Sequence, residues 1–194
     1  DVLKEENVKA TFFVVGTWVQ KYPDIVKRAQ GEGHSVLCHT HTHQWSIYTS
    51  FETYYNDLYK VESAVEKALG FKPQKIIRFP GGSTNQTSYQ YGGVKFMNYL
   101  TSDIINKGYY YIDWNVSSGD AGSAHNNKNN IIANVKKWSA GKSLAVALFH
   151  DTGTNHGLVD ALPEIIDYYR ENGFAFKNFK NISQTELDRM VELR

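Results

Sequence analysis

Apolar, β-branched runs alternate along the chain with segments that have one apolar helical face, and this alternation restricts the fold more than any other feature. Runs such as VKATFFVV and SLAVALFH have the composition of strands buried on both faces. The six predicted strands cover residues 8–15, 34–39, 75–79, 109–116, 143–150 and 174–179. The predicted helices cover residues 24–33, 51–69, 94–106, 130–139 and 158–171. Strands separated by helices form parallel βαβ units, so we predict an α/β fold: an irregular (β/α) barrel of about seven strands, with a doubly wound open sheet as the alternative.

The longest predicted helix begins near residue 50. Thr49 and Glu52 have the spacing of a capping box, in which two side chains satisfy free N–H groups at a helix start. Apolar residues then recur every three or four positions, at Phe51, Tyr54, Leu58, Val61, Val65 and Leu69. This period places them on one side of the helix, which we expect to face the core.

Length and charge narrow the possible partners. At 194 residues the chain is long enough for a sizeable core, and we predict one domain over residues 1–194. The 21 Lys and Arg balance the 20 Asp and Glu, so there is no strong field for binding nucleic acid or an anionic membrane. No run approaches the ~18 apolar residues of a membrane-spanning helix. The single cysteine, Cys38, excludes an intrachain disulfide.

The first residues of the chain also carry a prediction. Residues 1–7, DVLKEEN, have the pattern of the last turns of an amphipathic helix that lacks a start signal. We therefore expect a first strand and most of a helix to precede Asp1, so that the predicted domain is N-terminally truncated.

Ionisable side chains gather where predicted strands end. His39, Arg78, Asp113 and His150 each lie at or near the carboxyl end of such a run. In α/β barrels and open α/β sheets, the loops that leave these ends converge around one active site. We therefore expect these side chains to serve one site.

The sharpest local motif is CHTHTHQ at residues 38–44. His39, His41 and His43 share one side of an extended chain, whereas a helical turn brings His39 and His43 together. Either geometry suits a divalent metal, for which neutral imidazole is a standard ligand, although two histidines need a further donor, usually a carboxylate. The alternative is a polar loop whose histidines are satisfied by backbone and water.

Two further residues at strand ends are candidates for catalysis. His150 follows the apolar run LAVALF; it either caps the strand or acts as an acid or base when an amine leaves an amide. Arg78 ends an apolar segment, where a buried guanidinium needs a partner. Its role is a structural ion pair or catalysis, and the two are compatible.

The loops after these strands add further candidates. In DWNVSSGD, residues 113–120, Asp120 is placed to orient a histidine or to pair with Arg78. Trp114 either fills the core or lines a sugar subsite, because aromatic faces stack on sugar rings. Gly81 and Gly82 allow the backbone to approach a ligand closely.

Taken in order, these segments resemble the motifs of the polysaccharide deacetylase family, also called the NodB homology domain or carbohydrate esterase family 4. The segments are VKATFFVVG at 8–16, HTHTH at 39–43, RFPGG at 78–82, DWNVSSGD at 113–120 and LFHD at 148–151. The resemblance covers essentially the whole chain. It implies an irregular (β/α) barrel and a metal-dependent hydrolase of N-acetyl groups.

The resemblance implies roles for five polar residues. His39 and His43 are implied as ligands of a divalent metal, which we expect to be zinc, with cobalt, nickel or iron as alternatives. His150 is implied as the catalytic histidine and Asp120 as the residue that tunes it. Arg78 is implied to steady the catalytic base.

The resemblance implies three residues on the substrate side of the site, and the aromatic character of Trp114 adds a fourth. Thr40 corresponds to the supporting hydroxyl of the histidine motif, and Leu148 to a pocket wall. Gly81 replaces a tyrosine often found after the proline, and its backbone N–H is expected to help hold an oxyanion. Trp114 is the candidate for a sugar subsite.

One family motif has no counterpart here. The family's Thr-Phe-Asp-Asp-Gly motif supplies the catalytic base and a third metal ligand, and these 194 residues contain no Asp-Asp pair. We expect the motif to precede Asp1, and we expect the 194-residue chain alone to be inactive or nearly so.

These implications favour a bacterial polysaccharide N-deacetylase, extracellular or associated with the cell wall. Its expected substrate is the N-acetylglucosamine of peptidoglycan, or chitin oligomers, and it is expected to act as a monomer. Two alternatives remain open: a non-catalytic carbohydrate-binding domain of the same fold, and a metal-dependent hydrolase of another amide.

Overall fold

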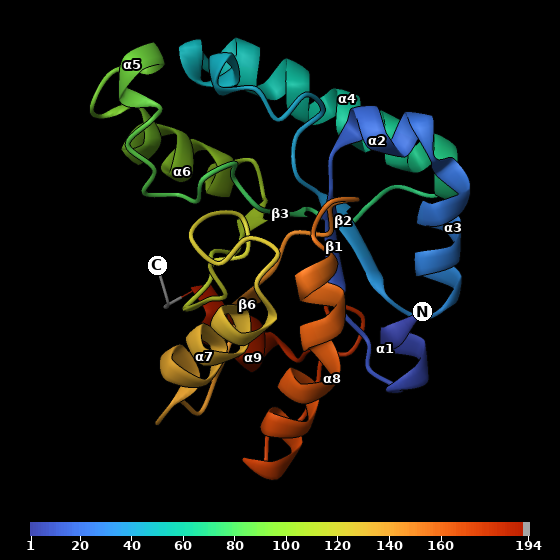
Figure 1. The fold of residues 1–194 in the computed structure, drawn as a ribbon. Coiled ribbons are helices and arrows are strands. Elements are labelled where there is room, and N and C mark those ends of the chain that lie inside the picture. The colour runs from blue at the N-terminus through green and yellow to red at the C-terminus, as the bar shows by residue number, and fades with distance from the viewer. Residues whose placement is uncertain (192–194) are drawn as a thin grey trace. The chain divides into compact units, whose positions relative to one another are not determined.

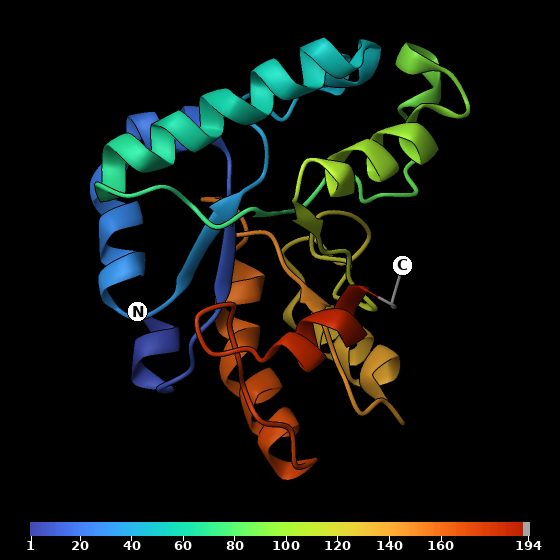
Figure 2. The same cartoon turned by 180° about the vertical axis from the view of Figure 1, so that it is seen from behind.

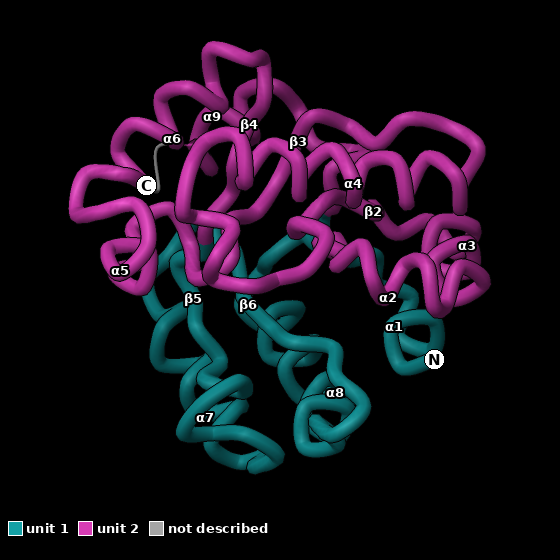
Figure 3. Tube along the Cα trace, turned by 90° about the horizontal axis from the view of Figure 1, so that it is seen from above, with its two compact units in different colours: residues 1–10, 114–177, 193 teal, residues 11–113, 178–192, 194 magenta. Residues whose placement is uncertain are grey.

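The computed structural model describes residues 1–191, which form two compact units (Figure 3). Unit 1 comprises residues 1–10 and 114–177, and unit 2 comprises residues 11–113 and 178–191. Each unit therefore contains segments that are far apart in the sequence.

The sheet of unit 2 has four parallel strands (Figure 1). They are β1 (Thr11–Val14), β2 (Ser35–Cys38), β3 (Ile76–Ile77) and β4 (Tyr110–Tyr111). Phe12 pairs with Val36, Cys38 with Ile77, and Ile76 with Tyr110. The strands lie side by side in chain order, as in the wall of a (β/α) barrel, whereas a doubly wound sheet reverses its order at a switch point.

Helices and one 3₁₀ turn complete unit 2. They are α2 (Gly16–Lys21), α3 (Pro23–Gly31), the 3₁₀ helix η1 (Trp45–Thr49), α4 (Phe51–Leu69), α5 (Tyr89–Gly92), α6 (Phe96–Asn106) and α9 (Gln184–Val191). Helices α2 and α3 pack along α4, as seen from behind in Figure 2. No helix within residues 1–191 is both long enough and apolar enough to cross a membrane.

Helix α4 confirms the predicted apolar face and corrects its predicted start. Ser50, not Thr49, is the N-cap, and its Oγ accepts a hydrogen bond from the N–H of Thr53 at 3.1 Å. The Thr49 hydroxyl instead donates to the carbonyl of Ser46. Gly70 ends the helix in the left-handed conformation, which glycine adopts without strain.

The apolar face of α4 is buried as predicted. Its fully buried residues are Tyr54, Leu58, Val61 and Val65. Burying a side chain such as Leu58 stabilises the fold by roughly 1.5–3 kcal/mol.

Unit 1 is built around a shorter parallel pair. Its elements are α1 (Val2–Glu5), β5 (Val116–Ser117), α7 (Lys128–Ser139), β6 (Ala147–Leu148) and α8 (His156–Glu171). Val116 pairs with Ala147, and its side chain lies in a core with Ile131 and Ile165. Arg170 of α8 donates to the carboxylate of Glu6 at 2.8 Å and thereby ties the first residues of the chain to this unit.

Several sequence predictions are corrected by the structure. The predicted strand 109–116 is divided into β4 and β5, which belong to different sheets. Residues 174–179 form no strand. Phe174 and Phe176 pack edge-on against the ring of Tyr169, so the alternating apolar pattern that predicted a strand comes from the packing of two side chains on one ring. The short elements α2, η1 and α5 were not predicted. The α/β class with parallel strands is confirmed.

Candidate functional site

The segment after β2 brings two histidines together in unit 2. Thr40 and His43 have positive φ angles of 67° and 56°, so the chain turns tightly after the buried strand. The Thr40 side chain is buried, and its Oγ1 accepts a hydrogen bond from the N–H of His43 at 3.3 Å. The rings of His39 and His43 consequently lie 4.9 Å apart between centroids.

The tautomer of His39 follows from its partner. Its Nδ1 lies 2.7 Å from the main-chain carbonyl oxygen of Arg78, and a carbonyl oxygen can only accept. The proton therefore resides on Nδ1, and the lone pair of the ring is on Nε2. This arrangement is typical of histidines that bind metals.

Asp57, on the buried side of α4, fastens the histidine segment. One carboxylate oxygen accepts hydrogen bonds from the main-chain N–H groups of His41 and Thr42, and the other accepts from the Thr42 hydroxyl at 2.8 Å. Sequence reasoning missed this residue. The available signal was a carboxylate beside Tyr54 and Leu58 on the apolar face of a predicted helix.

The middle histidine of the motif has a different neighbour from the other two. Its ring is packed against Gly16, where a Cβ atom would come within 2.2 Å of Nδ1 of His41. That Nδ1 is buried and has no hydrogen-bond partner among the described residues. The His41 ring therefore packs on the start of α2, whereas the rings of His39 and His43 pack on each other.

Arg78 is held inside unit 2. Its guanidinium donates to the carbonyl oxygens of Ile112 at 2.9 Å and Asp113 at 3.2 Å, and lies over the ring of Phe13. Burial lowers the pKa of Arg78 to about 10, although the negative charge of Asp113 partly offsets this effect. The side chain therefore stays cationic at neutral pH.

The glycine turn after Arg78 is tied to the same strand end. Ser83 donates its main-chain N–H to Asp113 at 3.0 Å and its hydroxyl to the same carboxylate. Gly81 has a φ of 74°, and a Cβ atom there would lie 2.8 Å from the indole of Trp45. Both the conformation and the close approach of Trp45 therefore require glycine.

The donor set fits a divalent metal only in part. Two neutral imidazoles with neighbouring rings suit zinc and related ions. Within residues 1–191, however, no third His, Cys, Asp or Glu joins them in a metal-binding group. Burial raises the pKa of the Cys38 thiol, and the charge of Glu62 raises it further, so this neighbour of the motif is not a thiolate. His39 and His43 can therefore supply two ligands of a larger set.

In unit 1, Asp120 and His150 form the second polar cluster. The Asp120 side chain is 1% exposed, whereas that of His150 is 43% exposed. Nδ1 of His150 lies 2.9 Å from Oδ1 of Asp120, and the main-chain N–H of His150 donates to Oδ2 at 2.7 Å. Because the carboxylate accepts, His150 carries a proton on Nδ1 and keeps Nε2 for chemistry at the surface.

Two neighbours complete the environment of the carboxylate. Asn155, itself buried, donates to Oδ2 of Asp120 at 2.9 Å and to the carbonyl of His150 at 3.1 Å. The Ser118 hydroxyl lies 2.7 Å from both Oδ1 of Asp120 and the carbonyl oxygen of Leu148, and its single proton serves one of them at a time. Neither neighbour was predicted, because no local motif marks these contacts.

The balance of these effects keeps Asp120 ionised. Burial alone would raise the pKa of Asp120, but the hydrogen bonds donated by the side chain and backbone of His150 and by Ser118 hold it below its ordinary value. The predicted partnership of Asp120 with a histidine is therefore realised in unit 1.

Other polar side chains of unit 1 have local structural roles, and the other sequence candidates of this unit remain predictions. Asn115 exchanges hydrogen bonds with the backbone of residues 144 and 146, and His125 donates to the carbonyl of Asp120. Leu148 ends β6, and Trp114 is partly buried. Their proposed substrate contacts stay predictions, as does a common site for the residues of the two units.

Comparison with known proteins gives a consistent family assignment. The sequence model of the polysaccharide deacetylase family matches residues 1–97, half of the 194-residue chain. A peptidoglycan-N-acetylglucosamine deacetylase of Bacillus cereus is 31% identical over 193 residues, which cover 97% of this chain. The chain spans only 63% of the length of that relative.

Solved structures share the fold. The catalytic domain of a peptidoglycan N-acetylglucosamine deacetylase from Eubacterium rectale is 34% identical, with a TM-score of 0.84 over 95% of this chain and 81% of that one. A carbohydrate esterase family 4 pseudoenzyme from Bacillus anthracis, 24% identical, has a TM-score of 0.72 over 96% of this chain and 58% of that one. The predicted fold is thereby confirmed, while likeness of fold alone does not distinguish an enzyme from a pseudoenzyme.

Proposed function

The chain belongs to the polysaccharide deacetylase family, and from this premise we propose that the protein hydrolyses N-acetyl groups of an amino-sugar polymer. The proposed substrate is the N-acetylglucosamine of peptidoglycan, with chitin oligomers as the second choice. The observation that carries the proposal is the buried Asp120 carboxylate, which orients an exposed His150 ring. Such a pair is suited to protonating a leaving amine.

We propose that His39 and His43 bind a divalent metal, zinc in the first instance and cobalt, nickel or iron otherwise. The hydrogen bond from Nδ1 of His39 to the Arg78 carbonyl supports this role, because it presents Nε2 to the ion. When bound, such an ion polarises an acetyl carbonyl and lowers the pKa of a water from ~15.7 toward roughly 7. The remaining donor and the catalytic base are proposed to come from an Asp-Asp pair that is not among these 194 residues.

His150 supplies the proton that completes the reaction. Hydrolysis joins a water oxygen to the acetyl carbon and breaks the C–N bond, so the departing nitrogen must gain a proton. Nδ1–H of His150 is donated to Asp120, and the proton is therefore delivered from Nε2. The anionic Asp120 stabilises the imidazolium that exists before this transfer.

The other matched residues have supporting roles in the proposal. Arg78 steadies the base, and its cationic guanidinium is already fixed by two carbonyl groups. The N–H of Gly81 donates to the developing oxyanion, while Leu148 and Trp114 contact the sugar. The side chain of Thr40 is buried, so Thr40 supports the histidine segment from the interior.

Acetate release tests the proposed function. The 194-residue chain and the complete product of its gene are stripped of metal, resupplied with zinc, and offered peptidoglycan, chitin oligomers and small acetamides. We expect the complete product to release acetate from a polymer only with metal, and His150→Ala to lower the rate. Full activity of the 194-residue chain would contradict the assignment of the base to residues outside it.

The same experiment separates the alternatives. Sugar binding without acetate release by the complete product indicates a non-catalytic carbohydrate-binding domain. Release from small amides alone indicates a different metal-dependent hydrolase.

The proposed substrate is a polymer of the cell wall, so we propose that the protein acts outside the cell or in the cell wall. We propose that it acts there as a monomer.

A further inference from the structure

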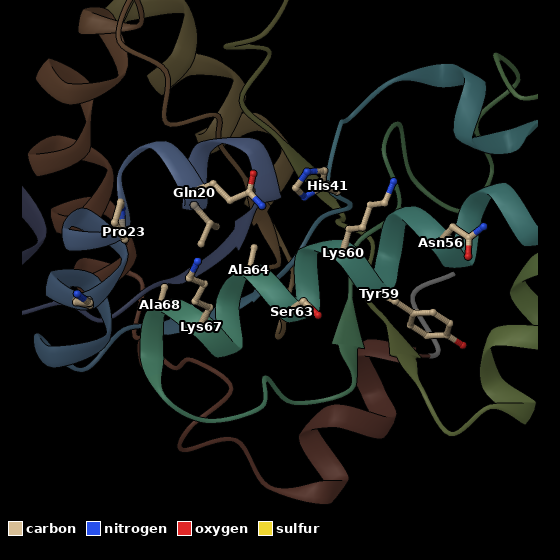
Figure 4. A pocket seen from close by; sticks show the side chains of 12 residues that line it. Gln20, Pro23, His41, Asn56, Tyr59, Lys60, Ser63, Ala64, Lys67 and Ala68 are labelled. Carbon is tan, nitrogen blue, oxygen red and sulfur yellow. The ribbon is translucent and has the colours of Figure 1, made fainter.

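A groove of about 1130 Å³ lies within unit 2, between α4 and the helices α2 and α3 (Figure 4). Its floor contains the small side chains of Ala64 and Ala68, which leave space between the helices. The volume exceeds the ~300–1,000 Å³ typical of small-molecule sites, so it accommodates a short segment of a chain.

The groove is cationic. Lys27, Lys60 and Lys67 line it, and none of its lining residues is an Asp or Glu. Lys27 is within 3.3 Å of Asp24, an exposed carboxylate of the same helix. Figure 4 shows Lys60 and Lys67 projecting from α4 toward the side on which Gln20 and His41 lie. The charge of the groove therefore favours an anionic occupant.

One end of the groove adjoins the histidine segment. His41 lines the groove, and it stands in the chain between His39 and His43. Its ring is held against Gly16, and its main-chain N–H is bound to Asp57. A chain seated in the groove thus contacts the histidine segment at His41, the residue that lies in sequence between the two proposed metal ligands.

We propose that this groove binds the acidic peptide stems of peptidoglycan. The inference rests on the proposed function, because it explains how a deacetylase would prefer peptidoglycan to chitin. The anionic groups of peptidoglycan are the carboxylates of its peptide stems, whereas chitin carries none. Lys60 and Lys67 are seven residues apart on α4, which corresponds to ~10 Å along the helix axis. An extended peptide covers that length in about three residues.

The side chains between the lysines suit a peptide backbone. Asn56, Ser63 and Gln20 line the groove and offer both donors and acceptors. A stem peptide would therefore find hydrogen-bond partners between the positive charges, while a glycan without stems would leave the lysines solvated.

The test compares ligands with and without the stem. Isothermal titration of the protein uses a peptidoglycan disaccharide with its peptide, the same disaccharide after an amidase has hydrolysed the peptide off and left the lactyl carboxylate free, and an uncharged chitin tetramer. The variant Lys60→Glu with Lys67→Glu reverses the groove charge. The control Lys95→Glu with Lys128→Glu makes the same change in net charge at two exposed lysines that do not line the groove. Circular dichroism verifies that both variants fold.

We expect the protein to bind the stem-bearing disaccharide about tenfold more tightly than the stripped one, since two exposed charge pairs contribute on this scale. The groove variant should lose this preference and the control should keep it. The preference should also shrink as salt is raised. Equal binding of the two disaccharides by the unmodified protein, or equal loss in the control, overturns the proposal.

Two further readouts separate the possible failures. Displacement of the stem-bearing ligand by a glycerol-phosphate polymer at equal charge concentration assigns the groove to phosphate polymers and overturns the stem assignment. Acetate release by the complete gene product from stem-bearing peptidoglycan, from stem-free glycan and from chitin oligomers tests the proposed function separately from binding in the groove. If release is absent from all three while the stem preference persists, the proposed function fails and the groove assignment stands.

Discussion

Nδ1 of His150 lies 2.9 Å from Oδ1 of Asp120, and the main-chain N–H of the same histidine donates to Oδ2, so one carboxylate holds both the ring and its backbone. Asp120→Asn keeps the shape but removes the charge that orients and stabilises the imidazolium. We expect kcat of the complete gene product to fall by about 10²- to 10⁴-fold with little change in KM. Acetate-release kinetics measure this. Asp160→Asn, at an exposed position of α8, is the matched control and should leave kcat unchanged.

The lowered pKa of Asp120 predicts how stability depends on pH. The folded protein holds this carboxylate ionised below the ordinary value of about 3.9, so the unfolded chain takes up the proton first as pH falls. The contribution of Asp120 is therefore complete above the unfolded pKa and is lost as pH falls through the folded pKa. We expect the difference in free energy of unfolding between the unmodified protein and Asp120→Asn to shrink as pH falls through the unfolded pKa of about 3.9 and below it. Urea titrations at several pH values check this, and a constant difference contradicts it.

Asn155 should behave as a positioning residue. Asn155→Ala removes the hydrogen bonds to Asp120 and to the carbonyl of His150. We expect a loss of about 1–3 kcal/mol in the free energy of unfolding. We also expect a roughly tenfold fall in kcat at unchanged KM, with an altered pH profile of kcat.

The control for Asn155 is another buried asparagine. Asn178 of unit 2 donates to the carbonyl of Gly33 and accepts from the N–H of Lys180. Asn178→Ala should cost comparable stability and leave the pH profile unchanged. If both variants alter the profile equally, Asn155 has only a structural role.

Metal binding should depend on two of the three histidines of the motif. His39→Ala and His43→Ala should weaken zinc binding by more than the ~10–100-fold typical of losing an outer partner. His41→Ala should leave the affinity nearly unchanged, because its ring packs against Gly16, whereas the rings of His39 and His43 contact each other. Zinc titration with a competing chelator distinguishes the three variants. Equal losses in all three would contradict the pairing of His39 with His43.

Gly81 is expected to tolerate substitution less well than Gly70. Both have positive φ angles, of 74° and 81°, so alanine strains the backbone at either position by about 1 kcal/mol. Only at Gly81 does a Cβ also meet the indole of Trp45, whereas Gly70 has open space. We expect Gly81→Ala to cost about 1–3 kcal/mol more than Gly70→Ala in thermal or urea unfolding. Equal costs would show that Trp45 moves aside freely.

The sequence predicted the long elements well because their signals are local. The apolar period of α4 and the run before His150 are both readable within a few residues, and helices α6, α7 and α8 begin within two residues of their predicted starts. The strands are shorter than their apolar runs, because only the paired central residues join a sheet. The run at 174–179 misled the prediction, since Phe174 and Phe176 pack on a side chain and pair with no strand.

The residues of the site could be predicted only where a sequence motif indicates their chemical role. His39, His43, Asp120 and His150 each stand in a recognisable pattern, and two contacts among them are present. Asn155 escaped notice because its partner Asp120 lies 35 residues away in the chain. Such contacts form when loops fold against each other, and a local sequence pattern carries no information about them.

The ion pair between Glu6 and Arg170 joins residues 164 positions apart within unit 1. A ribosome synthesises Glu6 long before Arg170, so residues 1–10 cannot make this contact until the segment around Arg170 has been synthesised. Unit 2 is interrupted too, because its final segment begins only at residue 178. Neither unit can be completed during early translation or excised as a continuous fragment. Folding of the described residues therefore depends on non-local contacts, which slow it.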